Sequence, residues 1–264
     1  MFSAFTKHRT LLRQLLVREI AARYRGSVMG ILWSLVTPIL MLGIYTFVFS
    51  YVFKARWAVQ TNDGTILNFA LMLFSGLLIH GMIADILVRS PRLVLDNANF
   101  VKKVVFPLET LSWIVLLSTL FNFIIGFMLL LGFVYWELQY IPMTVLWLPI
   151  ILVPFLFMLI GISWFLASLG VYIRDIQQIS GTLATFLLFL SPIFYSVTIL
   201  PESLQQFIYL NPITFVVEAF RNIVIYGLAP DFKGLLAYSF AALVMALCGF
   251  ATFRRMRRGF ADVV

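Results

Sequence analysis

Residues 111–135 read LSWIVLLSTLFNFIIGFMLLLGFVY, a run without any Asp, Glu, Lys or Arg. A helix needs about 20 predominantly apolar residues to cross the hydrocarbon core of a bilayer. The stretch therefore predicts a transmembrane helix. Working outward, the sequence predicts an all-α membrane protein with six transmembrane helices in a single domain, residues 1–264. The other five apolar runs are residues 31–53, 66–88, 145–171, 179–198 and 235–253.

The composition agrees with this interpretation. The chain is 62% hydrophobic and 11% charged, whereas a soluble domain carries about 25% charged residues. The remaining chain is too short for a soluble domain of useful size. Residues 1–30 do not resemble a cleaved signal peptide, because their charges continue to Arg25 and the following apolar run is long. Cys248 is the only cysteine, so no internal disulfide is possible.

The basic residues are distributed unevenly between the two sides of the predicted membrane domain. All but four of the 19 Lys and Arg residues fall in stretches that would share one side. The exceptions, expected on the opposite side, are Lys54, Arg56, Arg221 and Lys233. The positive-inside rule therefore predicts that both termini are cytoplasmic. The net charge of +8 is then a topology signal, and nucleic-acid binding is not expected.

Two segments on the predicted cytoplasmic side have helical character. Residues 5–25 place leucines at helical spacing between arginines, which indicates an amphipathic helix lying along the membrane surface. This helix is either an anchor or a lever moved by a partner. In residues 90–103, Pro91 suits the first turn of a short helix that Ser90 could cap. This segment is either a docking element or a tight connection.

The predicted outer segment, residues 199–234, is too apolar for a solvated loop and too broken for a span. Pro212 divides it into two short helical pieces, and Glu218 and Arg221 share one face of the second. Non-helical backbone persists at membrane depth only where protein or a water-filled cavity covers it. We expect a re-entrant helix pair, with a pair lying flat on the outer surface as the alternative.

Several kinds of chemistry are missing from the sequence. It contains no GxxxxGK[ST] nucleotide loop, and only His8 and His80 could supply imidazole to a metal. Asp85 is the one carboxylate inside a predicted span, and we expect it to pair with Arg89 one turn later. We expect His80 to form a hydrogen bond between helices, although an intramembrane His is also a functional candidate. A pump with so few intramembrane charges needs an external energy source.

Aromatic residues are plentiful in two of the predicted spans. Tyr45, Phe49 and Phe53 recur every four residues in the first span, and Phe186 and Phe189 lie in the fifth. Such a stripe packs against neighbouring helices or lipid, or it lines a channel. Aromatic rings can stack on sugar rings through many weak contacts, and a sliding polymer requires contacts of that kind.

Residues 18–33, REIAARYRGSVMGILW, resemble the start of type-2 ABC exporter permeases that move cell-surface polysaccharides. Pro38, the run Tyr172-Ile173-Arg174-Asp175-Ile176 and the Asn211-Pro212 break match the same pattern. The likeness covers nearly the whole chain and is greatest to the O-antigen branch, with capsule and teichoic-acid exporters as relatives.

The resemblance implies a homodimer in the bacterial inner membrane, paired with two copies of a separate ATPase that binds ATP and Mg²⁺. The chain itself would bind no cofactor or metal and would have no catalytic residues. The expected substrate is a lipid-linked glycan. The resemblance also implies that residues 5–25 and 90–103 transmit ATPase motion, through Arg18, Glu19, Arg23, Arg25, Arg92, Leu93, Asn97, Phe100, Lys102 and Lys103. It implies a channel lined by Trp33, Tyr45, Phe49, Phe53, Phe186, Phe189 and Tyr195. It implies a periplasmic gate over residues 199–230, with Phe207, Tyr209, Pro212, Glu218 and Arg221.

Two alternatives remain open at this stage. An ABC exporter of small hydrophobic compounds would have the same fold and differ only in substrate. A membrane enzyme acting on lipid-linked sugar would need a cluster of carboxylates or histidines near one surface, and the sequence lacks such a cluster.

Overall fold

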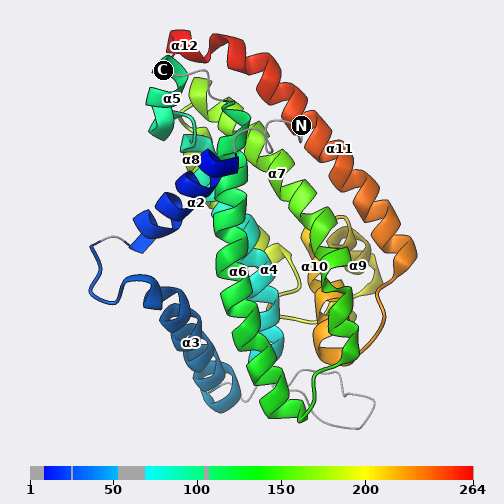
Figure 1. Ribbon diagram of the computed structural model, residues 1–264. Coiled ribbons are helices and arrows are strands. Elements are labelled where there is room, and N and C mark those ends of the chain that lie inside the picture. Colours follow the sequence, from blue (N-terminus) through cyan, green and yellow to red (C-terminus); the bar gives the residue numbers. More distant parts are fainter. Residues whose placement is uncertain (1–8, 25, 53–68, 104–106, 264) are drawn as a thin grey trace.

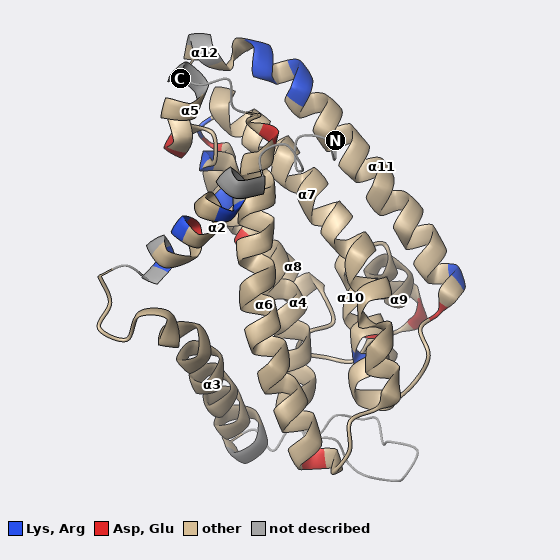
Figure 2. Cartoon of the chain, viewed as in Figure 1, with Lys and Arg blue, Asp and Glu red and all other residues tan. Residues whose placement is uncertain are grey.

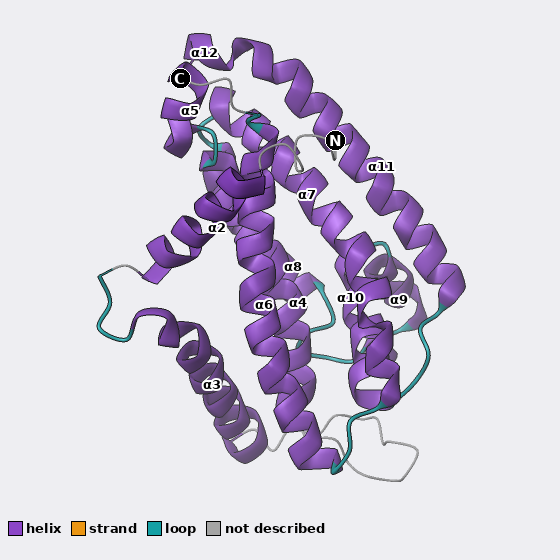
Figure 3. Cartoon of the chain, viewed as in Figure 1, coloured by secondary structure: helices purple, strands orange, loops and turns teal. Residues whose placement is uncertain are grey.

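The computed structural model describes residues 9–24, 26–52, 69–103 and 107–263, and every regular element in these ranges is a helix (Figure 1). Short loops join most of the helices (Figure 3). The predicted all-α membrane fold is confirmed. The longest helices are α4 (Phe69–Arg89), α6 (Glu109–Leu138), α7 (Leu148–Tyr172) and α11 (Phe232–Met256), and the shorter α3 (Trp33–Tyr45) precedes them.

Five segments of the described chain are long and apolar enough to cross a membrane. They correspond to five of the six predicted spans, with ends that differ by a few residues. The segments are Gly30–Phe49, Phe69–Arg92, Glu109–Leu138, Met143–Tyr172 and Phe232–Gly259. Two of them begin with a short turn, η1 (Gly30–Leu32) before α3 and η5 (Met143–Trp147) before α7.

The predicted fifth span, residues 179–198, is wrong in its bounds. The helix there, α8, covers Ile176–Leu190, and its 15 residues extend about 22 Å at 1.5 Å per residue. The hydrocarbon core is about 30 Å thick, so α8 alone does not cross it. The helix stops because Ser191 adopts an extended conformation (ψ 152°), which the following Pro192 favours sterically.

The predicted split of the outer segment at Pro212 is confirmed. Helix α10 (Pro212–Arg221) continues into the short π-helix η7 (Asn222–Tyr226). This continuous unit is bent by 99° from the preceding helix, α9 (Glu202–Tyr209). The side chain of Asn211 caps α10 by accepting a hydrogen bond from the Ile213 N–H (3.0 Å). Because α10 is buried against α4 and α7, it does not lie flat on a surface.

Helices α7 and α11 approach each other very closely. A Cβ atom built on Gly249 would lie 2.1 Å from the carbonyl oxygen of Gly161, and one built on Gly161 would lie 2.6 Å from that of Met245. Small residues allow backbones to approach in this way inside a membrane, where van der Waals packing drives helix association.

Charged residues concentrate at one end of the bundle, as Figure 2 shows. This end carries α2 (Arg9–Tyr24), α5 (Ala98–Lys103) and the final turns of α11, followed by η8 (Arg257–Gly259) and α12 (Phe260–Val263). The Tyr172 hydroxyl donates a hydrogen bond to the Met256 carbonyl (2.8 Å). The chain end therefore packs onto the same end of α7.

Candidate functional site

A group of charged side chains joins the surface helix α2 to the bundle. Asp85 on α4 accepts hydrogen bonds from Arg23 of α2, from Arg89 one turn along (3.2 Å) and from Thr119 of α6 (2.5 Å). Arg89 also forms an ion pair with Glu19 of α2. We call these five residues the α2 charge network. The predicted Asp85–Arg89 pair is confirmed, whereas no sequence pattern indicated that α2 and Thr119 complete the network.

The α2 charge network contains two acids and two bases, so its formal charges cancel. Each of the four charged side chains is only 20–34% exposed. Removing one partner from such a partly buried group leaves another charge without compensation, which costs more than losing a surface ion pair. The network therefore fixes α2 in one position relative to α4 and α6.

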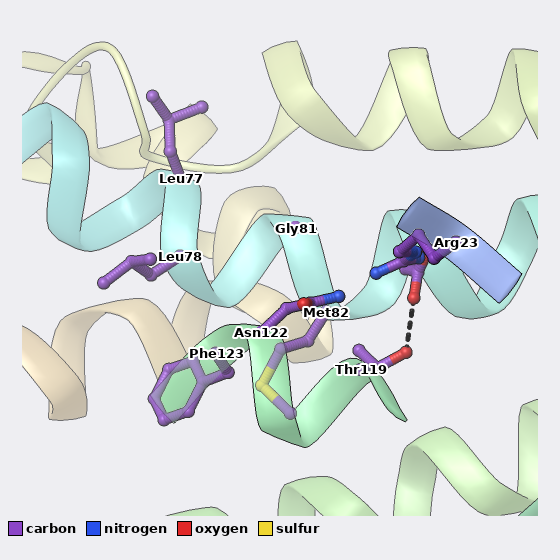
Figure 4. Close-up of a pocket in the computed structure, with 9 residues that line it drawn as sticks. Arg23, Leu77, Leu78, Gly81, Met82, Thr119, Asn122 and Phe123 are labelled. Atoms are coloured by element: carbon purple, nitrogen blue, oxygen red, sulfur yellow. Dashed lines mark hydrogen bonds and ion pairs between the residues drawn. The ribbon is translucent and has the colours of Figure 1, made fainter. Parts of the chain in front are cut away.

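A pocket of about 230 Å³ lies beside the network, between α4 and α6 (Figure 4). A Cβ atom built on Gly81 would meet no atom within 4 Å, so the absence of a side chain leaves this part of the pocket open. The network end of the pocket is polar and the far end is apolar. Its other lining residues are Arg23, Leu77, Leu78, Met82, Asp85, Thr119, Asn122 and Phe123.

The segment after α4 is fastened to α7. It forms two turns, η3 (Ser90–Arg92) and η4 (Leu95–Asn97), before α5. The Ser90 hydroxyl donates to the Ser163 hydroxyl (2.9 Å) and caps no helix, contrary to expectation. A Cβ atom on Gly170 would lie 2.0 Å from the Pro91 carbonyl oxygen. Because α4 runs from Arg89 directly into this segment, the α2 charge network and the segment are adjacent.

The residues assigned to coupling differ in their surroundings. Leu93 is buried and Phe100 packs against the core, whereas Arg18 and Arg92 are exposed. The Asn97 side chain donates to the Leu93 carbonyl (2.9 Å). Arg25 and the side chains of Lys102 and Lys103 lie outside the described residues.

The aromatic stripe of the first span meets the end of α8. Phe49 lies in the π-helix η2 (Thr46–Val52). Its ring stacks on that of Phe69, with 5.0 Å between the ring centroids, and its centroid lies 6.5 Å from that of Phe194. Phe194 in turn stacks on Phe189 at 5.6 Å. Two regions assigned to the channel are thus in contact within one chain.

The residues assigned to the channel differ in their exposure. Phe186 and Phe189 are exposed, and Trp33 is close to half-exposed. Tyr45 packs against the core, and its ring lies 6.5 Å from that of Phe49. The Tyr195 hydroxyl donates at 3.3–3.4 Å to carbonyls at the end of α8. Phe53 lies outside the described residues.

Arg221, one of the four basic residues expected on the outer side, is buried, with 1% of its side chain exposed. Its guanidinium donates to the carbonyls of Pro192 (2.6 Å), Ile193 (3.1 Å) and Met72 (2.9 Å). The ion pair with Glu218, at 3.6 Å, supports the predicted shared face. The contacts to Pro192 and Ile193 satisfy carbonyls that the break after α8 leaves without helical partners, and the contact to Met72 ties this break to α4.

The remaining gate assignments are mostly at the surface. Phe207 and Tyr209 on α9 are exposed, and Pro212 opens α10. His80 lies at a helix interface as expected, with its Nε2 3.0 Å from the Ala184 carbonyl oxygen. Among the described residues, no group of three or more His, Cys, Asp or Glu could hold a metal ion.

Comparisons with known proteins bear on the identity of this membrane domain. The chain is 29% identical over 262 residues to the O-antigen export system permease protein RfbA of Myxococcus xanthus, covering 98% of this chain and 96% of that protein. It is 24% identical to a Klebsiella pneumoniae protein of the same name, over 94% of this chain and 92% of that protein. It is also 25% identical to the polysialic acid transport protein KpsM of Escherichia coli, over 96% of this chain and 95% of that protein.

A family model described as ABC-2 type transporter matches residues 10–225. This range begins in α2 and ends in η7, so it contains the α2 charge network, the aromatic contacts and Arg221. Since the match spans most of its length, the chain belongs to the ABC-2 type transporter family of membrane proteins.

Proposed function

We propose that this chain is the permease subunit of an ATP-driven exporter that moves a lipid-linked cell-surface polysaccharide outward across the bacterial inner membrane. One observation carries the proposal. The chain aligns over 94–98% of its length with two O-antigen export permeases and a polysialic acid transport protein. Both termini would lie in the cytoplasm, because the basic residues concentrate at the end that carries α2 and α12.

The energy would come from a separate ATPase subunit. The sequence has no phosphate-binding loop of the GxxxxGK[ST] type, so ATP and Mg²⁺ would bind to the partner. Two copies of the ATPase would contact α2 and residues 90–103. The adjacency of the α2 charge network to this segment supports the proposal, because a push on either element would reach α4 through Arg89.

A homodimer would form the translocation path. No residue of α3 is buried within the single chain, and the aromatic contacts near Phe49 lie where α3 approaches the end of α8. A second copy would cover part of α3 and complete a path lined by aromatic rings. Such rings offer a sugar polymer many weak and equivalent contacts. The bent pair of α9 and α10 would close the periplasmic end.

The test compares a strain in which the chromosomal gene is deleted with the same strain supplied with the chain and its ATPase from a plasmid. We expect the deletion strain to lose long-chain surface glycan and to keep its drug sensitivity unchanged. In proteoliposomes, we expect lipid-linked glycan to stimulate ATP hydrolysis by the purified complex. Intact surface glycan combined with altered drug sensitivity would assign the chain to small hydrophobic compounds instead.

A further inference from the structure

One face formed by the last turns of α11 and by η8 changes from apolar to basic along the chain. Each of its residues lies three or four positions from another member, which places them on a single stripe of the helix surface. The apolar half lies toward the middle of the predicted span and the basic half toward its end (Figure 2). The stripe consists of Leu247, Phe250, Ala251, Arg254, Arg255 and Arg258.

A groove of about 710 Å³ runs along this stripe and is closed on one side by the start of α6. The wall is fixed, because Arg257 donates to both carboxylate oxygens of Glu109 at 2.8 and 3.0 Å. Both bonds come from Nη1 of Arg257, and this ion pair neutralises the one acidic residue that lines the groove. The volume falls within the range of about 300–1,000 Å³ that is usual for small-molecule sites.

Three positive charges remain in the groove after that pairing. Arg254, Arg255 and Arg258 are exposed, and none has an acidic partner within the part of the chain that the structure describes. The Arg254 guanidinium lies 5.8 Å from the centre of the Phe250 ring, a contact that keeps its charge at the junction between the apolar and basic halves.

From this arrangement we infer that the groove binds a bilayer phospholipid with two phosphate groups, the chemistry of cardiolipin. Guanidinium groups bind phosphate through paired hydrogen bonds, and basic pockets beside transmembrane helices on the cytoplasmic side suit such headgroups. A headgroup with two phosphates would match two of the three remaining positive charges, whereas a headgroup with one phosphate would match only one. The acyl chains would lie along Leu247, Phe250 and Ala251. The inference uses the position of α11 in the membrane and not the identity of the exported substrate.

The test measures lipid binding to the purified full-length chain by native mass spectrometry, with cardiolipin, phosphatidylglycerol and phosphatidylethanolamine as probes. The test variant is Arg255→Gln/Arg258→Gln. The control, Arg13→Gln/Arg174→Gln, removes two exposed arginines from outside the groove. We expect cardiolipin to bind most tightly and the test variant to weaken it about 30-fold, since each arginine near an anionic surface contributes about 1 kcal/mol and 1.4 kcal/mol is tenfold. The control should leave binding nearly unchanged.

A second variant, Ala251→Trp, fills the apolar half and leaves every charge in place. We expect it to weaken cardiolipin as well. Equal weakening by the control variant would overturn the inference, because it would indicate a general surface potential. Unchanged binding to Ala251→Trp, or displacement of cardiolipin by a polyprenyl diphosphate, would also overturn it. Neither the ATPase nor the glycan is present, so failure of the proposed export function would not alter these results.

Discussion

The close approach of α7 and α11 makes Gly249→Ala a sharp test of the packing. The new methyl group would lie 2.1 Å from the Gly161 carbonyl oxygen, whereas carbon and oxygen in close contact lie about 3.3–3.6 Å apart. The helices must therefore separate locally by more than an ångström. A gap of about 0.5–1 Å already forfeits a quarter to a half of each dispersion contact, and overpacking typically costs about 1–3 kcal/mol.

A matched control separates this effect from helix propensity. Gly132 lies in α6, and a Cβ atom there would meet nothing within 4 Å. Replacing Gly by Ala in a helix gains up to about 1 kcal/mol from propensity alone. We expect Gly132→Ala to be neutral or stabilising and Gly249→Ala to be destabilising by up to about 2 kcal/mol after that gain.

The assay is reversible unfolding of the purified chain in mixed micelles, titrated with SDS and followed by circular dichroism. The free energies of unfolding of the two variants should differ by about 2 kcal/mol. Because Gly161→Ala perturbs the same contact, its effect should not add to that of Gly249→Ala. Equal stability of Gly249→Ala and Gly132→Ala would refute the reasoning and mean that the two backbones lie further apart.

Three further predictions concern the α2 charge network, the buried arginine and the aromatic contacts. Arg89→Gln removes partners from Glu19 and Asp85 together, so it should lower the free energy of unfolding by about 3 kcal/mol. Replacing the exposed Arg92 by Gln should change that free energy by no more than about 0.5 kcal/mol. Equal effects of the two substitutions in the SDS titration would contradict the network. Arg221→Lys keeps the charge, but an ammonium group cannot reproduce the guanidinium hydrogen bonds to the carbonyls of Met72, Pro192 and Ile193. It should therefore lower the free energy of unfolding by about 2–4 kcal/mol and expose the break after α8 to proteolysis. A cleavage pattern like that of the parent protein would argue against this role. Phe49→Ala should slow glycan export more than it lowers expression, while Phe240→Ala, on the exposed face of α11, should affect neither; parallel loss of export and expression for Phe49→Ala would favour simple packing.

Much of the architecture could be predicted from local sequence. The spans follow from apolar run length, because a bilayer requires about 20 apolar residues in a helix. The bend before α10 follows from Pro212, and the Asp85–Arg89 pair follows from a spacing of four residues on one helix. Each of these features depends on neighbours along the chain. Pro192 disfavours a helical conformation at Ser191 and so indicates the end of α8. The predicted span nevertheless continued to residue 198, because the residues after Pro192 are also mostly apolar.

The candidate site required the tertiary structure. Glu19 and Arg89 are 70 residues apart in sequence, and Thr119 joins them through Asp85 from a third helix. The burial of Arg221 depends on carbonyls from α4 and from the end of α8, which no spacing rule connects. Hydropathy and helical periodicity thus determined which segments enter the membrane. Ion pairing, buried hydrogen bonding and close glycine packing depend on distances between remote segments, and only the folded bundle sets those distances.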